Sequence, residues 1–355
     1  MLRFQSQSEF QTTLRKRVRE YLKENNLSGK ADYRFYVKAV ANLAIYLAPF
    51  IIWLVFKPGV WGTIGLFAIT GVGMAGVGMN LMHDALHDTV TKSEWWNRRM
   101  GAVLYLLTGN SYTWKTQHNV KHHTHTNLEG MDDDIDAGSI LRLHPEQPLK
   151  KAHKYQHIYA PFAYTLMTLK WLFQKDFSQV VEYGYSDVYK AKDQSITSVW
   201  IKLIVGKAIH FSVFYVLPLA LGVVWYKVLI ANLVMHVMAG TILSFIFQMA
   251  HVVDRVQFPS AEEAKNDSLL EHQLKTTANF GNKSRIVTWF TGGLNFQVEH
   301  HLFPSINHVH YPKIAEIVKK TAAEFNLPYN EYKTFASALK GHFRHLRYMG
   351  NTAIA

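Results

Sequence analysis

Long uncharged hydrophobic runs alternate with polar stretches along the chain of 355 residues. The runs form two pairs, each broken by a short turn, and they cover residues 39–56, 60–82, 208–226 and 228–250. An α-helix needs about 20 predominantly apolar residues to cross a bilayer, and each run has about that length. Buried helices of a large soluble protein are the alternative, but four uncharged runs of this length favour membrane-spanning helices.

The order of these runs predicts the organisation of the whole chain. We expect one all-α integral membrane domain, 1–355, in which two hairpins of transmembrane helices carry a cytoplasmic helical cap. The expected boundaries are 1–38 for an N-terminal segment, 39–82 for the first hairpin, 83–207 for a polar section, 208–250 for the second hairpin and 251–355 for a second polar section.

The distribution of basic residues predicts the orientation in the membrane. The formal charge is +12, and of 38 Lys and Arg residues the two hairpin turns hold only Lys57 and Lys227. Because basic residues concentrate on the cytoplasmic side, both polar sections and both termini should face the cytoplasm. The start of the chain, MLRFQSQSEFQTTLRKRVRE, does not have the apolar core of a cleaved signal. The charge flanks the membrane runs, so we do not expect nucleic acid binding.

Two shorter apolar stretches are expected to lie along the membrane surface. Residues 158–173 include Lys170, and residues 102–107 are too few to span a bilayer. Several aromatic side chains are expected to anchor this interface or to line a substrate path: Trp95, Trp96, Tyr112 and Trp114.

The 19 histidines include three clusters with helical spacing, HDALH (83–87), QHNVKHH (117–123) and QVEHH (297–301). Positions i, i+3 and i+4 share one helix face, so each cluster can direct several side chains to one point. His251 directly follows the fourth apolar run, as the first cluster follows the second run, and this places them at the same boundary. The candidate metal ligands are His83, His87, His118, His122, His123, His251, His300 and His301.

The types of ligand restrict the metal. The chain has no cysteine, so nitrogen and oxygen must bind any metal, and imidazole suits zinc, copper, nickel or iron. A structural zinc site closes with four ligands, whereas eight histidines suit two metals in a reactive centre. A carboxylate-rich di-iron site would need two Glu-x-x-His motifs, which the sequence does not have. Asp84 is expected to fix a histidine tautomer, with direct metal binding as the alternative. The isolated histidines are expected to be ordinary hydrogen-bonded residues: His144, His153, His157, His272, His342 and His345.

The three clusters, interleaved with two pairs of membrane helices, resemble the histidine boxes of the membrane fatty-acid desaturases. The resemblance runs from the first apolar run to LPYNEY near residue 330. It implies two non-haem iron ions held by the eight histidines, with His251 as the extra ligand after the last membrane helix. It also implies that dioxygen and two electrons are used to remove two hydrogens from an acyl chain and leave a cis double bond.

Gln297 indicates which subgroup of the desaturases the chain resembles. A glutamine at the start of the third box is similar to the front-end desaturases, which insert a double bond between an existing one and the carboxyl end. Gln297 could bind iron through its amide oxygen, or hold a water or a neighbouring histidine by hydrogen bonds. Many front-end members carry a fused cytochrome b5 domain with a His-Pro-Gly-Gly motif. That motif does not occur here, so we expect a separate donor, either ferredoxin or free cytochrome b5.

The substrate sets further requirements. An unactivated methylene needs an iron-based oxidant, and a tunnel must hold the acyl chain in one register. The small residues of GVGMAGVGMN (71–80) could line that tunnel or serve helix packing. The acidic run 132–136 is expected to be a solvated loop; the alternative, implied by a similar acidic stretch after the second box of the desaturases, is that it packs near the site. A basic cluster could bind the phosphate of coenzyme A or of a phospholipid, or simply attract the membrane surface: Arg142, Lys150, Lys151 and Lys154.

Other functions share part of this pattern. A hydroxylase, an acetylene-forming enzyme or a sphingolipid desaturase would carry similar boxes. A histidine-rich metal transporter would place its ligands along a path through the membrane. Only His210 and His236 lie inside the predicted spans, which disfavours transport.

Overall fold

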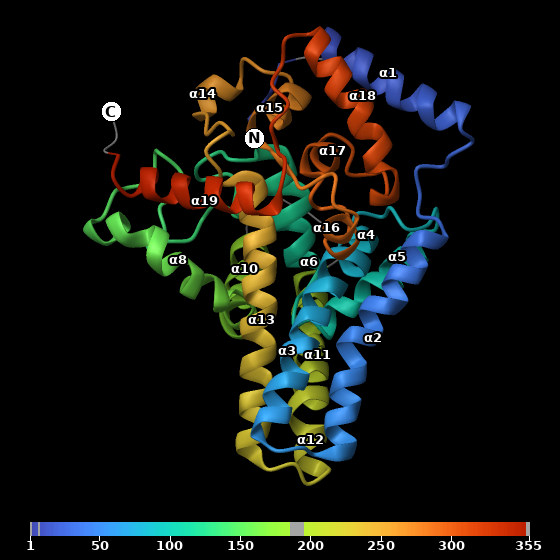
Figure 1. Cartoon of the computed structure of the whole chain (residues 1–355), viewed down its shortest axis with the longest axis vertical. Coiled ribbons are helices and arrows are strands. Elements are labelled where there is room, and N and C mark those ends of the chain that lie inside the picture. The colour runs from blue at the N-terminus through green and yellow to red at the C-terminus, as the bar shows by residue number, and fades with distance from the viewer. Residues whose placement is uncertain (1, 6–7, 185–194, 353–355) are drawn as a thin grey trace.

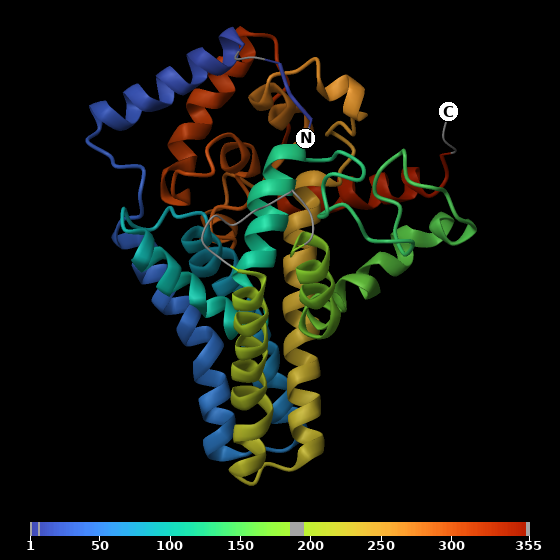
Figure 2. The ribbon, with the colours of Figure 1, turned by 180° about the vertical axis from the view of Figure 1, so that it is seen from behind.

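The computed structural model describes residues 2–5, 8–184 and 195–352, and this part of the chain is almost entirely helical. Within it, four helical spans are long and apolar enough to cross a membrane: Tyr33–Phe56, Val60–Leu86, Ile196–Ala220 and Trp225–His251. They occupy the lower half of Figure 1, and the shorter helices gather at the other end. Figure 2 shows the same division from behind. Length and apolar composition thus give a membrane bundle with a helical head.

Two of the four spans are continuous helices, α2 (Tyr33–Phe56) and α13 (Trp225–His251). The other two contain π-helical turns, where an extra residue widens the helix. The second span is α3 (Val60–Val77), η1 (Gly78–Met82) and α4 (His83–Leu86). The third is α11 (Ile196–Phe211), η6 (Ser212–Val216) and α12 (Leu217–Ala220).

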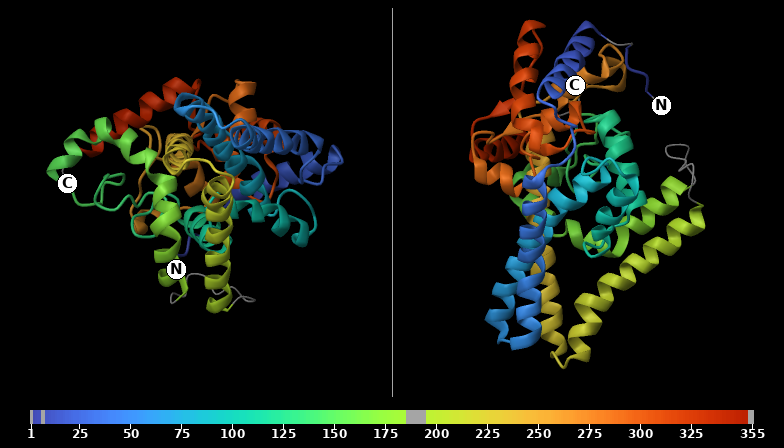
Figure 3. Two further views of the ribbon diagram at one scale, coloured as in Figure 1. Left: turned by 90° about the horizontal axis from the view of Figure 1, so that it is seen from below. Right: turned by 90° about the vertical axis from the view of Figure 1, so that its right-hand side faces the viewer.

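The third span begins at Ile196, well before the predicted residue 208. The charge of Lys207 interrupts the apolar run without ending the helix, because the lysine is buried and paired. Its ammonium donates to Asp176 Oδ2 at 2.8 Å and to the main-chain oxygens of Thr108 and Trp171. In the right view of Figure 3, α11 leans away from the other long helices.

Small residues allow the long helices to pack closely. A Cβ on Gly73 of α3 would overlap the backbone of α2 at Tyr46, and one on Gly71 would overlap the backbone of α13 at Met235. These glycines therefore serve helix packing, which is one of the two roles predicted for residues 71–80.

The head contains the remaining elements. Its helices before α11 are α1 (Glu9–Glu24), α5 (Glu94–Gly101), η2 (Ala102–Tyr105), α6 (Ser111–Trp114), η3 (Lys115–His122), α7 (His123–His125), η4 (Lys151–Tyr155), α8 (Gln156–Thr165), α9 (Met167–Lys170), η5 (Trp171–Lys175) and α10 (Asp176–Gly184). Those after α13 are α14 (Ala261–Ala264), α15 (Leu269–Thr276), α16 (Arg285–Phe290), α17 (Gln297–Leu302), η7 (His308–His310), α18 (Tyr311–Glu324) and α19 (Phe335–Met349). Two short strands, β1 (Asn279–Phe280) and β2 (Glu331–Tyr332), pair in parallel, which is a small departure from the all-α prediction.

The two shorter apolar stretches differ from each other. Helix α8 (Gln156–Thr165), which overlaps the start of residues 158–173, extends sideways from the bundle and exposes apolar side chains such as Ile158 and Phe162. Residues 102–107 are partly buried, with Ala102 exposed. Leu104 and Leu107 are buried in the core of the bundle, because the 3₁₀ turn of η2 packs against the long helices.

Candidate metal centre

Each histidine cluster lies on a short helical turn where the bundle meets the head. His83 begins α4 directly after the π-turn η1, and His300 and His301 belong to α17. The second cluster differs from the predicted α-helix, because η3 is wound as a π-helix. The wider turn aligns residues four to five apart, so the rings of His118 and His122 lie nearly parallel with centroids 5.3 Å apart. His123 begins the next turn, α7.

The eight predicted ligands converge, although they come from five elements. One group joins His83, His87, His118 and His300, whose ligand atoms all lie within 4.8 Å of one another. A second group joins His122, His251 and His301 within the same distance. His123 lies against both groups, with ring centroids 4.6 Å from His300 and 4.3 Å from His301. The sequence prediction that these side chains meet at one place is confirmed by this geometry.

The hydrogen bonds of these imidazoles leave inward-facing nitrogen atoms free. His300 Nδ1 lies 3.1 Å from the Tyr311 hydroxyl, and His301 Nδ1 lies 2.8 Å from Gln273 Oε1. The Nε2 atoms of all eight histidines are buried, and no described residue bonds to them. Buried polar atoms are rarely left without a partner in proteins. A metal pair at this place would satisfy them, so the residues fit the implied cofactor.

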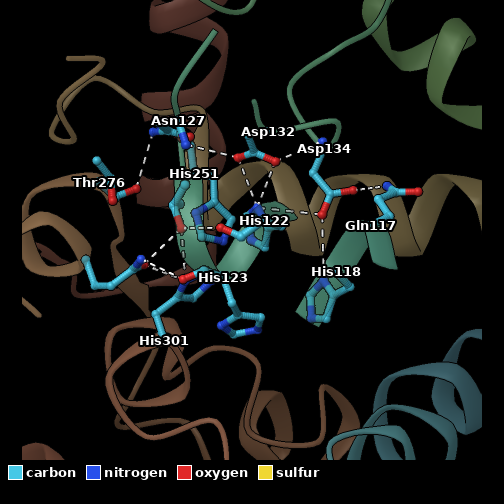
Figure 4. A network of polar contacts seen from close by, with 12 residues as sticks. Gln117, His118, His122, His123, Asn127, Asp132, Asp134, His251, Thr276 and His301 are labelled. Carbon is cyan, nitrogen blue, oxygen red and sulfur yellow. Dashed lines mark hydrogen bonds and ion pairs between the residues drawn. The ribbon is translucent and has the colours of Figure 1, made fainter. Parts of the chain in front are cut away.

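The acidic run after the second cluster packs against the site through Asp132 and Asp134, which is the alternative that the resemblance implied, and only Asp136 is exposed as in a solvated loop. Asp132 is buried, and its carboxylate lies 3.0 Å from His122 Nδ1 and accepts from the backbone N–H of Asn127. Asp134 pairs with His118 and His122 at 3.6 Å and accepts from the Gln117 amide. Figure 4 shows both carboxylates above the histidines. They leave solvent because each finds several donors at the metal-binding end of η3.

These contacts shift the pKa values of the site. Burial lowers the pKa of His118 to about 3 against the effect of Asp134, and it lowers the pKa of His300 and of His301 well below the usual value. Burial would also lower the pKa of His122, but the Asp132 carboxylate raises it above the usual value. Neutral imidazole is the form that binds metals, so burial prepares most of these ligands for binding. The Asp132 carboxylate increases the basicity of the His122 ligand.

Asp84 lies beside the first group of ligands and also contacts Asn307 and His308. Its Oδ1 is 3.4 Å from His83 Nδ1, while Oδ2 lies 2.5 Å from His308 Nδ1 and accepts from the Asn307 amide. His308 Nε2 in turn lies 2.8 Å from the buried ammonium of Lys38 on α2. A neutral His308 thus connects the positive charge of Lys38 to the negative charge of Asp84.

A cavity of about 490 Å³ opens beside the first group of ligands. His83, His118 and Gln297 line its inner end, and the Oε1 atom of Gln297 is buried without a partner among the described residues. Its middle walls are apolar: Met74, Gly78, Met79, Met82, Leu107, Leu243, Ile246 and Leu294. Met74, Gly78 and Met79 of residues 71–80 therefore line the cavity, whereas Gly71 and Gly73 pack against neighbouring helices. Long apolar pockets with a few polar groups are typical of ligand sites.

The aromatic residues divide between the two predicted roles. Trp114 lines the cavity, and its ring centroid is 4.6 Å from that of His118. Trp95 and Trp96 are exposed on α5, in contact with each other. His210 and His236 are buried between α11 and α13, away from the two ligand groups, and hydrogen-bond through Nδ1 to Leu106 O and Thr168.

The predicted head-group cluster does not form as expected. Arg142 is buried, and its guanidinium donates to the main-chain oxygens of Pro145, Gln147, Met349 and Thr352. It is therefore a structural residue, and its inclusion in a surface cluster was wrong. Lys150, Lys151 and Lys154 are exposed at the start of η4, and none of them lines the cavity.

Several contributing residues were missed in the sequence: Gln273, Asn307, His308, Tyr311 and Lys38. The H-V-H of η7 was an available signal. Lys38 gave a weaker signal, as a cation at the very edge of an apolar run.

Tyr329, in the LPYNEY segment, donates to the buried Glu299 at 2.9 Å, and burial raises the pKa of Glu299 to about 8.

Comparison with known proteins decides the family. Residues 58–333 match the family model described as fatty acid desaturase. The chain belongs to the fatty acid desaturase family. It is 34% identical over 349 residues to an acyl-lipid (8-3)-desaturase of Physcomitrium patens, covering 97% of this chain and 72% of that protein. It is 31% and 32% identical to sn-1 linoleoyl-lipid 6-desaturases of Arthrospira platensis and Synechocystis, covering 96% and 99% of this chain and 92% and 98% of those proteins. As a desaturase, it acts on fatty acyl chains.

Proposed function

We propose that this desaturase uses two non-haem iron ions and dioxygen to insert a cis double bond between an existing double bond and the carboxyl end of an acyl chain. The observation that carries this proposal is the set of eight histidines with buried, unpartnered Nε2 atoms, which gather in adjacent groups beside an apolar cavity that His83 and His118 line. Bound iron would supply the oxidant that removes hydrogen from an unactivated methylene.

The ligand groups suggest how the two ions are shared. His83, His87, His118 and His300 would hold one iron, and His122, His251 and His301 the other. His123 lies against both groups and supplies a further nitrogen. Asp132 and Asp84 would orient ligands rather than bind metal, because each already accepts hydrogen bonds from other residues.

Gln297 supports the front-end position of the new double bond. It replaces the first histidine of the third box, and its free amide oxygen faces the cavity beside His83 and His118. There it can bind iron or hold a water against it. The relatives named above are 6-desaturases of linoleoyl-lipid and an acyl-lipid (8-3)-desaturase. For linoleoyl chains, position 6 lies on the carboxyl side of the existing double bonds.

Charge at the outer part of the cavity supports a membrane lipid as the acyl carrier. The lining there includes Lys170 and Lys175, but also three carboxylates: Asp133, Asp136 and Glu182. Coenzyme A carries several phosphate charges, which this excess of carboxylates would repel. An uncharged or zwitterionic glycerolipid avoids that repulsion, and its acyl chain can enter from the bilayer beside α8.

The arrangement of the helices supports the predicted topology. In this proposal α2 and α3 form one transmembrane hairpin. Helices α11, α12 and α13 form the other, and the head and both termini lie on the cytoplasmic side. In that orientation the metal centre lies at the cytoplasmic boundary. A separate ferredoxin or cytochrome b5 with its reductase can then deliver electrons.

Fatty-acid analysis tests the reaction. A host that makes no such products would express the chain and receive linoleic acid. We expect a new cis double bond on the carboxyl side of the existing ones, and no new product with the His301→Ala variant. Desaturation only on the methyl side would contradict the front-end assignment, and hydroxy fatty acids would indicate a hydroxylase.

Metal analysis tests the cofactor separately. Purified protein should contain about two irons per chain, the number expected for a dinuclear histidine centre. His122→Ala should lower the iron content and abolish product formation. A fully active preparation that contains only zinc would rule out the di-iron centre.

A further inference from the structure

A second hollow lies on the head, outside the metal centre. It has a volume of about 630 Å³ and lies between the start of α8 and the end of α19. These two helices lie side by side in Figure 1 and in the left view of Figure 3. It shares no lining residue with the cavity beside the histidines. We call it the α8–α19 groove; its polar lining consists of Lys154, Tyr155, His157, Arg344, Arg347, Tyr348 and Asn351.

The charge of this groove is uniformly positive. Lys154, Arg344 and Arg347 line it, and no carboxylate does. Arg344 donates to Asp254 at 3.0 Å through Nε, which leaves its terminal nitrogens available. Among the ion pairs of residues 2–5, 8–184 and 195–352, none includes Lys154 or Arg347. Guanidinium and ammonium groups gathered around one hollow suit a phosphate, which arginine binds through two parallel hydrogen bonds.

The walls of the α8–α19 groove are held at a fixed separation. The Gln156 amide donates to Leu346 O at 2.8 Å, and Arg142 donates to Met349 O at 2.6 Å. A Cβ on Gly350 would overlap the main-chain oxygen of His153, so the end of α19 lies directly against η4. The groove is therefore formed before any ligand arrives, which lowers the entropic cost of binding.

The outer face of α8 shows which kind of phosphate reaches this place. Tyr155, Ile158, Phe162 and Leu166 are 56, 60, 70 and 55% exposed and recur every three or four residues, so they form one apolar stripe. A helix with such a stripe lies in the membrane interface with the stripe among the acyl chains. The α8–α19 groove lies at the N-terminal end of this stripe, and Tyr155 and Ile158 belong to both. This places the groove at the level of the lipid phosphates.

We propose that the α8–α19 groove binds the phosphate of an anionic glycerophospholipid, whose acyl chains lie along the stripe of α8. The bound lipid is not the substrate. It neutralises Lys154 and Arg347, which have no carboxylate partner among the described residues, and it fastens the C-terminal helix of the head to the membrane.

Lipid-dependent stability tests this proposal on the full chain in neutral detergent. Phosphatidylglycerol should raise the unfolding temperature more than phosphatidylcholine at the same concentration. In the double variant Lys154→Gln with Arg347→Gln, the affinity for phosphatidylglycerol should fall about 30-fold, the combined effect of two basic side chains at a membrane surface. The matched control is Lys16→Gln with Lys313→Gln, which removes two exposed cations from α1 and α18 and should keep the full response.

Two outcomes would overturn the proposal. The first is an equal response of the groove variant and the control. The second is an equal stabilisation by inorganic phosphate at the concentration of the lipid, which would make the groove a site for free anions. If the groove variant does not fold, native mass spectrometry of the unsubstituted protein decides: it should retain phosphatidylglycerol in preference to phosphatidylcholine. None of these measurements depends on desaturation, so they stand or fall apart from the proposed reaction.

Discussion

At the scale of single residues, the metal centre depends on side chains that bind no metal. Asp132, Asp84, Gln273 and Tyr311 hold Nδ1 atoms of the ligands and so direct Nε2 inward. The ligands themselves could be predicted, because their spacing and their position after apolar runs are local features. Asp84, adjacent to His83, was also predicted as a partner, but Gln273 and Tyr311 could not be predicted, because they lie outside the histidine clusters. His301 and Gln273, for example, are 28 residues apart.

Asp132→Asn should weaken iron binding. The amide removes the negative charge beside His122 Nδ1, and losing such a partner typically lowers metal affinity by about 10- to 100-fold. Iron content after dialysis against a mild chelator measures the effect. The control Glu316→Gln, on the exposed surface of α18, should retain as much iron as the unsubstituted protein. Equal retention by Asp132→Asn would exclude this role.

Replacing His308 should affect the other group of ligands. His308→Leu disconnects Lys38 from Asp84 and leaves both charges buried. We expect weaker iron retention, by about tenfold, since an oriented carboxylate beside His83 is lost. His308→Gln can still donate to Asp84 through its amide and should recover part of the loss. Equal iron retention by His308→Leu and His308→Gln would show that the hydrogen bond to Asp84 does not contribute to iron binding.

At the scale of helices, the sequence predicted the membrane-spanning segments more accurately than it predicted their first and last residues. The spans α2, α3 and α13 lie close to the predicted runs, because burial in a bilayer demands uncharged residues over a fixed length. The start of α11 was missed because the charge of Lys207 is cancelled by Asp176, a contact between segments far apart in the sequence. The parallel pairing of β1 with β2 was missed for the same reason.

Two glycines of α3 give a matched test of helix packing. Gly73→Leu places a side chain against the backbone of α2 at Tyr46, whereas Gly65 has open space around its Cβ position. We expect Gly73→Leu to destabilise the fold by at least about 1–3 kcal/mol, the usual cost of overpacking. Gly65→Leu should be near neutral. Thermal unfolding in detergent measures both, and equal effects would contradict the close packing of α2 on α3.

At the scale of the whole molecule, the order of hairpins and polar sections already predicted that distant histidines would meet. The burial of side chains inside the head could not be predicted in the same way. Its packing buries histidines that the sequence marked as ordinary. His144, His272, His342 and His345 are all buried in the head, where each forms a hydrogen bond.

These four histidines should make the fold sensitive to acid. Burial lowers the pKa of His144, His272, His342 and His345 to about 4 each, against an ordinary value of 6.5. The unfolded chain therefore binds more protons between these values, and the stability present above pH 6.5 is lost as the pH falls towards 4. Unfolding temperatures measured across this range should decrease, and less steeply for His345→Gln. A profile that stays flat down to pH 4 would contradict the shifts.

The π-helical winding of η3 has a consequence for how the second box can change. A π-turn carries one more residue than the α-turn it replaces, and every backbone bond on either side can be satisfied in both forms. Deleting one residue between Trp114 and His118 would therefore leave a continuous helix with the same histidines in the same order. It would nevertheless replace the wider turn by an α-turn, so Trp114 and His118 would be three rather than four residues apart and their rings would meet at a different angle. In this stretch the number of residues, as much as their chemical type, constrains which sequences can hold the metal.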